Sequence, residues 1–319
     1  MQKLIIHVGT PKTGTSTLQR MFFDKSDDQL ERKRILYPIH NHSGGCGKGR
    51  VANASILQPE YYNVDELVEN FEQWFSMADT VFLSEEVLFL DNNMEKIQYL
   101  RNNDVQIVIM AFFRNAAEYL SSLWMEFNRF ENRRIVSSLT DFMKGREYLT
   151  GIGNLMSLVA SNPEYVFHFC PYRPKRFDKN SVVEALEIIG SDLDPKQFEN
   201  YNESMTRLEA DIRQLAVTNH WQFGSHINSD DIKKIAAEIK SGDRRPVIET
   251  LSDDIIEQTC LEHEPFLDYL MRVDPNNRNV SFKDIRPSCF GKQRDAYQPI
   301  SLDEYEKIKM MLQDTVPEE

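Results

Sequence analysis

The chain has 319 residues, of which 41% are hydrophobic and 11% aromatic, so it can bury the core of one large domain or two small ones. Its 37 basic and 50 acidic residues give a net charge of −13, which argues against general binding to nucleic acid or to an anionic membrane. No stretch of about 18 consecutive apolar residues occurs, and we therefore expect no membrane span.

The four cysteines are scattered along the chain, and no two of them form a Cys-x-x-Cys pair. This pattern is typical of reduced thiols and does not indicate a zinc ribbon. A hydrophobic strand is predicted almost from Met1, which leaves no room for a signal peptide. These features predict a soluble cytoplasmic protein, and they do not indicate an oligomeric state.

The first predicted element is a strand over residues 3–8, followed by a turn and the start of a helix. The turn offers backbone N–H groups, hydroxyls and the cation of Lys12 to an anion at a helix N-terminus. Gly9 and Gly14 have the separation of the glycines in a Walker A loop, but the next residue is Thr15 rather than lysine. Because the lysine lies before the second glycine, we expect a phosphate ligand other than a nucleoside triphosphate with magnesium.

A polar, glycine-rich loop over residues 38–50 is the next feature. It contains His40 and His42, which together with Cys46 suggest a metal site. A clear fourth ligand is lacking, so we expect no metal. A loop that binds a second substrate and an ordinary surface loop both fit the pattern.

Two further strands are predicted over residues 80–84 and 105–113. The first is followed by the two carboxylates of Glu85 and Glu86. The second is almost continuously apolar, as strands buried on both faces of a parallel sheet are, and it ends at Arg114. Ligands of open α/β sheets bind at the carboxyl ends of the strands. We therefore expect Arg114 and the carboxylates at the same sheet edge as the first turn.

The rest of the chain is predicted to contain one more strand, near residues 165–169, and then mainly helices. Strands that alternate with helices indicate βαβ units and a parallel sheet, hence the α/β class. A capping box formed by Thr206 and Glu209 opens one helix toward Trp221. The other predicted helices span residues 178–190 and about 230–241, 253–272 and 302–313.

We therefore predict a single domain over residues 1–319. It would consist of an α/β core over residues 1–210 and a mainly helical extension over residues 211–319.

Two motifs resemble one enzyme family. The turn Pro11-Lys12-Thr13-Gly14-Thr15-Ser16-Thr17 resembles the 5′-phosphosulfate loop of sulfotransferases that use 3′-phosphoadenosine 5′-phosphosulfate (PAPS), in particular the bacterial branch. Arg114, with Ser122 eight residues later, resembles the 3′-phosphate site of the same family, with Ser121 as the neighbouring candidate. A guanidinium group and a hydroxyl suit a phosphate monoester.

The resemblance implies a three-layer P-loop-like fold, with a central parallel β-sheet flanked by helices and a helical C-terminal region. It also implies that Lys12 supports the bridging oxygen as the sulfonate leaves. The phosphosulfate would be held by Thr13, Gly14, Thr15, Ser16 and Thr17.

Several further roles follow from the resemblance. Glu86 is implied as the general base, with Glu85 in reserve. The alternatives are His40 and His42, because histidine is the base in other branches of the superfamily. In a late loop, Lys292 and Arg294 would close over the 3′-phosphate.

The predicted function is transfer of a sulfonate group from PAPS to an acceptor hydroxyl on a glycan, a glycolipid or a small metabolite. The transfer would be in line, would use a general base and would need no metal. Its nucleotide product would be adenosine 3′,5′-bisphosphate. The alternatives are a P-loop kinase or nucleotide hydrolase, and a non-catalytic nucleotide-binding module. A glycosyltransferase-like enzyme has no supporting motif.

Overall fold

The described residues of the computed structural model form two compact units. The first comprises Met1–Asn115, Arg146–Asn202 and His263–Ile285, and the second comprises Ala116–Gly145, Glu203–Glu262 and Arg286–Glu319. The structure describes residues 1–8, 10, 13–39, 44–45, 51–57, 63–86, 88, 104–129, 138–144, 147–172, 181–197, 206–218, 229–274, 281, 285–287, 289–293 and 295–314.

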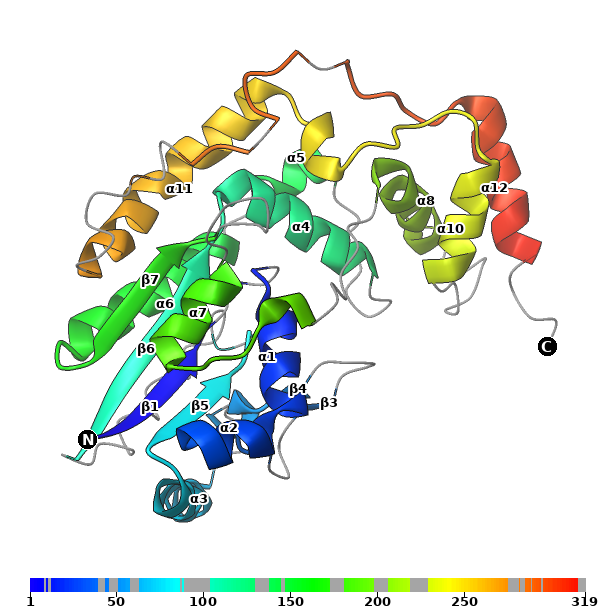
Figure 1. The fold of residues 1–319 in the computed structure, drawn as a ribbon. Coiled ribbons are helices and arrows are strands. Elements are labelled where there is room, and N and C mark those ends of the chain that lie inside the picture. The colour runs from blue at the N-terminus through cyan, green and yellow to red at the C-terminus, as the bar shows by residue number, and fades with distance from the viewer. Residues whose placement is uncertain are drawn as a thin grey trace. The chain divides into compact units, whose positions relative to one another are not determined.

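The first unit is built on a five-stranded parallel sheet with the strand order β2-β5-β1-β6-β7. Figure 1 labels four of these strands, β5, β1, β6 and β7. The chain adds strands first on one side of β1 and then on the other, so β1 lies at the switch point where ligands of open α/β sheets bind. The strands are β1 (Gln2–His7), β2 (Ile35–Leu36), β5 (Thr80–Ser84), β6 (Val105–Phe113) and β7 (Val166–Pro171).

The predicted α/β class with a central parallel sheet is confirmed. The four predicted strands are present, while the two-residue strand β2 was not predicted from the sequence. A separate antiparallel pair is formed by β3 (Gly44–Gly45) and β4 (Val51–Ala52).

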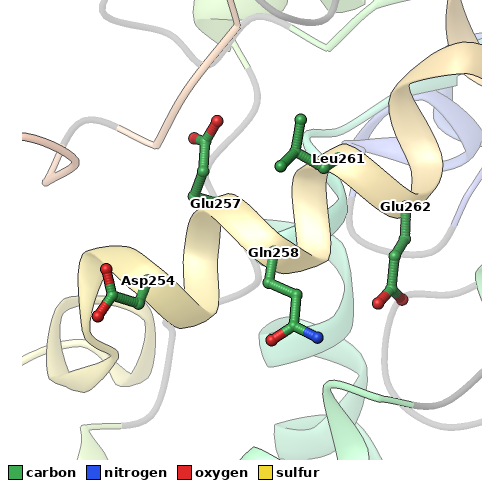
Figure 2. Close-up of a pocket in the computed structure, with 5 residues that line it drawn as sticks. All are labelled: Asp254, Glu257, Gln258, Leu261 and Glu262. Carbon is green, nitrogen blue, oxygen red and sulfur yellow. The ribbon is translucent and has the colours of Figure 1, made fainter.

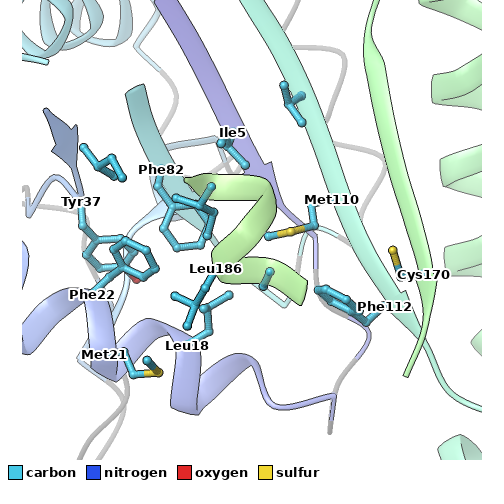
Figure 3. Packing of buried hydrophobic residues seen from close by; sticks show 14 residues of the cluster. Ile5, Leu18, Met21, Phe22, Tyr37, Phe82, Met110, Phe112, Cys170 and Leu186 are labelled. Atoms are coloured by element: carbon cyan, nitrogen blue, oxygen red, sulfur yellow. The ribbon is translucent and has the colours of Figure 1, made fainter. Parts of the chain in front are cut away.

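Both faces of the sheet are buried, as expected for parallel strands covered by helices. On one face, Ile5 packs with Phe22, Phe82, Phe112 and Leu186 in a single apolar cluster (Figure 3). Phe22 belongs to α1 (Thr15–Asp24) and Leu186 to α7 (Ser181–Ile189), so these two helices cover this face. The opposite face carries side chains that are also fully buried, among them Leu4, Ile6, Leu83 and Ile109.

Helix ends in the first unit follow local capping chemistry. The side chain of Asn63 accepts hydrogen bonds from the N–H groups of Asp65 and Glu66 at the start of α3 (Val64–Met77). The predicted end of α7 at Gly190 is confirmed, with a φ of 84° that favours glycine. The other helices here are α2 (Ser26–Lys33), η1 (Ala54–Leu57), α6 (Glu147–Ser161) and η5 (Pro195–Gln197).

The second unit is helical in its described part. Its apolar core joins Leu208 and Ile212 of α8 (Arg207–Thr218), Ile235 of α10 (Ser229–Glu238) and Ile308 of α12 (Leu302–Asp314). The unit also contains α4 (Ala116–Arg129), α5 (Leu139–Phe142) and η6 (Val247–Thr250), and α11 (Asp253–Val273) contributes to both units. Among the described helices, none combines the length and the apolar character needed to cross a membrane.

The predicted capping box at the start of α8 is confirmed. The Thr206 N–H donates to Glu209 Oε2 at 2.7 Å, and the Glu209 N–H donates to Thr206 Oγ1 at 3.3 Å. Arg207 then reaches Asp211 through Nε at 2.8 Å and stacks on the ring of Tyr297, whose centroid lies 4.4 Å from the guanidinium carbon. This contact fixes the segment before α12 on α8.

Candidate active site at the carboxyl edge of the sheet

The turn after β1 is anchored on the end of β6. The Val8 N–H donates to the Met110 carbonyl at 2.8 Å. Thr10 Oγ1 donates to the Phe112 carbonyl at 2.6 Å, and Thr13 Oγ1 donates to the Thr10 carbonyl at 2.7 Å. The described part of the turn is therefore held beside the strand that leads to Arg114. Lys12 lies outside the described residues, as do Gly9 and Pro11, so the predicted role of Lys12 stays a prediction.

The turn leads directly into the N-terminus of α1. Gly14 is the N-cap residue with a φ of 88°, and its carbonyl accepts from the N–H groups of Thr17 and Leu18 at 3.1 Å. Thr15 Oγ1 is buried and has no hydrogen-bond partner among the described residues. A helix N-terminus with a free buried hydroxyl attracts an anion, because its first N–H groups carry partial positive charge. Ser16, like Thr17, is half-buried.

The two carboxylates predicted from the sequence follow β5 at the same edge. Glu85 is buried, and its N–H donates to the His7 carbonyl at 3.2 Å. Burial raises the pKa of Tyr37 well above its usual value, and the negative charge of Glu85 raises it further. The Glu85 carboxylate therefore lies close enough to Tyr37 to act on it electrostatically. Glu86 is half-buried.

Arg114 is the third predicted residue at this edge. Its guanidinium carbon lies 4.8 Å from the ring centroid of Tyr172, which follows β7 and donates its N–H to the Phe113 carbonyl at 2.7 Å. The buried Asn115 donates from Nδ2 to the Ile285 carbonyl at 2.6 Å. The arginine is thus stacked on an aromatic ring at the point where two strands end.

Two further predicted residues belong to the second unit. Ser122 is half-buried on α4 in the second unit, and the neighbouring Ser121 donates its hydroxyl to the Glu118 carbonyl of its own helix at 3.1 Å. Lys292 is exposed, also in the second unit. Their roles stay predictions, and His40, His42 and Arg294 lie outside the described residues.

The structure also reveals a set of polar residues that the sequence did not single out. His7 Nδ1 lies 3.0 Å from Ser84 Oγ, and Gln19 Nε2 donates to both Ser84 Oγ and the Ser84 carbonyl at 3.2 Å. We refer to His7, Gln19 and Ser84 as the buried polar junction. All three are buried, and burial lowers the pKa of His7 from 6.5 to about 3. His7 and Ser84 are polar residues at the ends of apolar strands, and this was the available signal for them. Gln19 lies among mainly polar neighbours at the start of α1 and carries no such signal.

Other surface features do not match the predicted chemistry. A groove along α11 is lined by three carboxylates, Gln258 and Leu261, and all five side chains project from that one helix (Figure 2). This acidic lining is unsuited to a phosphate ligand. Within the described ranges, no three His, Cys, Asp or Glu side chains come together in a way that could hold a metal ion.

No family model matches the sequence, and no curated protein matches it. Among solved structures, the chain is similar to a sulfotransferase from Alicyclobacillus acidocaldarius, with a TM-score of 0.36 and 13% identity over 69% of this chain and 96% of that chain. It is also similar to the sulfotransferase domain of the Synechococcus PCC 7002 olefin synthase, with a TM-score of 0.32 and 12% identity over 82% of this chain and 94% of that chain. Values this low transfer neither an activity nor a binding residue to this chain.

Proposed function

We propose that this protein is a PAPS-dependent sulfotransferase that transfers a sulfonate group to an acceptor hydroxyl. The observation that carries the proposal is the N-terminus of α1, where the buried Thr15 hydroxyl has no partner among the described residues. This donor lies directly after a turn that is anchored on β6 by Thr10. A compact anion such as a phosphosulfate suits this arrangement, because the helix offers N–H groups and a hydroxyl together.

Arg114 would bind a second anionic group on the same ligand. It follows β6, the strand that also anchors the turn, and it is stacked on Tyr172. A nucleotide with a 5′-phosphosulfate and a separate 3′-phosphate presents two such groups. The planar guanidinium suits the 3′-phosphate, since it binds phosphate oxygens through two parallel N–H groups. Tyr172 would hold the guanidinium plane in place.

The transfer step assigns a role to the carboxylates after β5. Glu86, or Glu85 in its place, would take the proton of the acceptor hydroxyl as its oxygen forms a bond to sulfur. The bond between sulfur and the bridging oxygen breaks, and the electron pair stays on the phosphate. Lys12 and the N-terminus of α1 would offset this charge, an electrostatic contribution that is often the largest in such sites. The acceptor is proposed to be a glycan, a glycolipid or a small metabolite.

The proposal is tested by calorimetric titration with adenosine 3′,5′-bisphosphate, with 5′-AMP and with ATP plus magnesium as comparison ligands. We expect the bisphosphate to bind and Arg114→Ala to weaken it by about tenfold to a hundredfold, the loss of one charge-assisted contact. The matched control is Arg32→Ala on α2, which removes the same charge from an exposed ion pair between Arg32 and Asp192. Its affinity should equal that of the wild type.

The comparison ligands separate the alternatives. Binding of ATP with magnesium, without binding of the bisphosphate, would contradict the proposal and favour a P-loop kinase or nucleotide hydrolase. Binding of the bisphosphate without transfer of sulfonate to any acceptor would favour a non-catalytic nucleotide-binding module.

A further inference from the structure

The buried polar junction connects three elements that each lead into the proposed site. His7 is the last residue of β1 before the turn, Gln19 lies one helical turn after Thr15 on the buried face of α1, and Ser84 directly precedes Glu85. The three residues are at most 1% exposed. Their hydrogen bonds therefore link the phosphate-binding turn and helix to the strand end that carries the carboxylates.

A fourth side chain fixes this strand end from the other side. β2 pairs with β5 only as far as Leu36 and Val81, so β5 extends beyond its neighbouring strand. Here the fully buried Asn53 replaces the missing strand. Its Oδ1 accepts from the Ser84 N–H at 2.8 Å, and its Nδ2 donates to the Phe82 carbonyl at 3.0 Å. The Asn53 N–H also donates to the Ser84 carbonyl at 3.2 Å. Ser84 is thus held at its backbone and at its side chain.

Burying these polar side chains in the core has a free-energy cost. Burying polar groups is costly unless each one is hydrogen-bonded, and apolar residues of similar size would pack here without that requirement. The neighbouring positions show this, since Ile5, Leu18 and Phe82 are apolar and fully or almost fully buried. The cost is only partly offset, because His7 Nε2 and Gln19 Oε1 have no hydrogen-bond partner among the described residues. What the hydrogen bonds to Ser84 add is direction, since they orient the strand end relative to α1.

We propose that the buried polar junction is a positioning device that holds the carboxylates after β5 at a fixed separation from the anion bound by the turn. The inference rests on the proposed function, because it takes the turn and α1 to be the phosphosulfate site. Gln19 and Ser84 are positioning residues in this scheme. They act through Glu85 and Glu86 and touch neither the nucleotide nor the acceptor.

The proposal has an electrostatic consequence. A negatively charged carboxylate that is held close to a bound phosphate repels it. Replacing Glu85 and Glu86 by glutamine removes this charge and should therefore strengthen binding of the phosphate. The size of this gain in affinity reports how closely the two carboxylates are held to the ligand.

Breaking the junction should reduce this gain. In the wild-type background we expect the combined variant Glu85→Gln, Glu86→Gln to bind adenosine 3′,5′-bisphosphate about fivefold more tightly. In Gln19→Met the same two substitutions should change the affinity by less than about twofold, since the carboxylates are no longer held near the ligand. All four proteins are compared at one pH, so titration of the ligand does not contribute.

A matched control is available at the opposite edge of the sheet. Gln2 Nε2 donates to the Phe75 carbonyl at 2.7 Å at the start of β1, so Gln2→Met removes a similar amide hydrogen bond far along the strand from the turn. In Gln2→Met the two carboxylate substitutions should raise the affinity as much as they do in the wild type. Ser84→Ala, which removes only the hydroxyl, should behave like Gln19→Met and decides the outcome if the glutamine variant does not fold.

The results separate this inference from the proposed function. If the wild type binds no bisphosphate, the proposed function is wrong and the inference falls with it. If the wild type binds but the carboxylate substitutions have the same effect in folded Gln19→Met and Ser84→Ala as in the wild type, the junction only stabilises the fold. The positioning role alone is then overturned.

Discussion

The neutral state of His7 makes a quantitative prediction for folding stability. His7 is 1% exposed, and burial lowers its pKa from 6.5 to about 3. As the pH falls below 6.5, the unfolded chain takes up a proton on this histidine, whereas the folded chain stays neutral until about pH 3. Folding stability is therefore lost as the pH falls between these two values.

The size of the effect follows from the two pKa values. A pH of about 5 lies roughly 1.5 units below the pKa of this histidine in the unfolded chain. Each unit corresponds to about 1.36 kcal/mol, so the free energy of unfolding falls by about 2 kcal/mol. In His7→Gln the titrating group is gone. Urea unfolding of both proteins at about pH 7.5 and 5 should show that the wild type loses about 2 kcal/mol more than the variant.

Comparing two pH values cancels the energy of the hydrogen bond that His7→Gln also removes. The hydrogen bond to Ser84 changes the absolute stability of His7→Gln, but only the change with pH is used. Between about pH 7.5 and 9 the histidine is neutral in both states, so the difference between the two proteins should stay constant there. Equal losses in the two proteins on acidification would show that His7 is protonated in the folded chain and would refute the reasoning.

Two further predictions concern residues that shape the same edge. Gly14→Ala should cost about 1–2 kcal/mol and weaken bisphosphate binding, because a φ of 88° is unfavourable for alanine. Gly153→Ala, in the open on α6, should instead be neutral or stabilising by up to about 1 kcal/mol, and a loss as large as that of Gly14→Ala would contradict this. Asn53→Ala should cost about 3 kcal/mol in urea unfolding, because buried backbone groups of β5 lose their partners. Asn70→Ala, whose amide bonds only its own helix, should cost less than about 0.5 kcal/mol, and equal losses would argue against the strand-replacing role of Asn53.

The longer elements could be predicted because their signals are local. The strands at 80–84 and 105–113 have the predicted bounds, since each is a mainly apolar run that fits a buried parallel strand. The capping box at Thr206 was predictable because it closes within one helical turn. β2 was missed because two residues have no periodicity, and this strand exists only through its pairing with β5.

The sequence by itself determined which groups meet at the carboxyl edge. Parallel strands all end at the same side, so the turn after His7, the carboxylates after Ser84 and the arginine after Phe113 had to lie along one edge once the sheet was predicted. The roles of Lys12, His40 and His42 were also inferred from the sequence and stay predictions.

Only the tertiary structure decided how that edge is held together. His7 and Ser84 are 77 positions apart, Gln19 and Ser84 are 65 apart, and Asn53 comes from yet another segment. A single polar residue in an apolar strand or helix carries no local signal for its partner, because the hydrogen bonds that make its burial favourable form only when distant segments pack together.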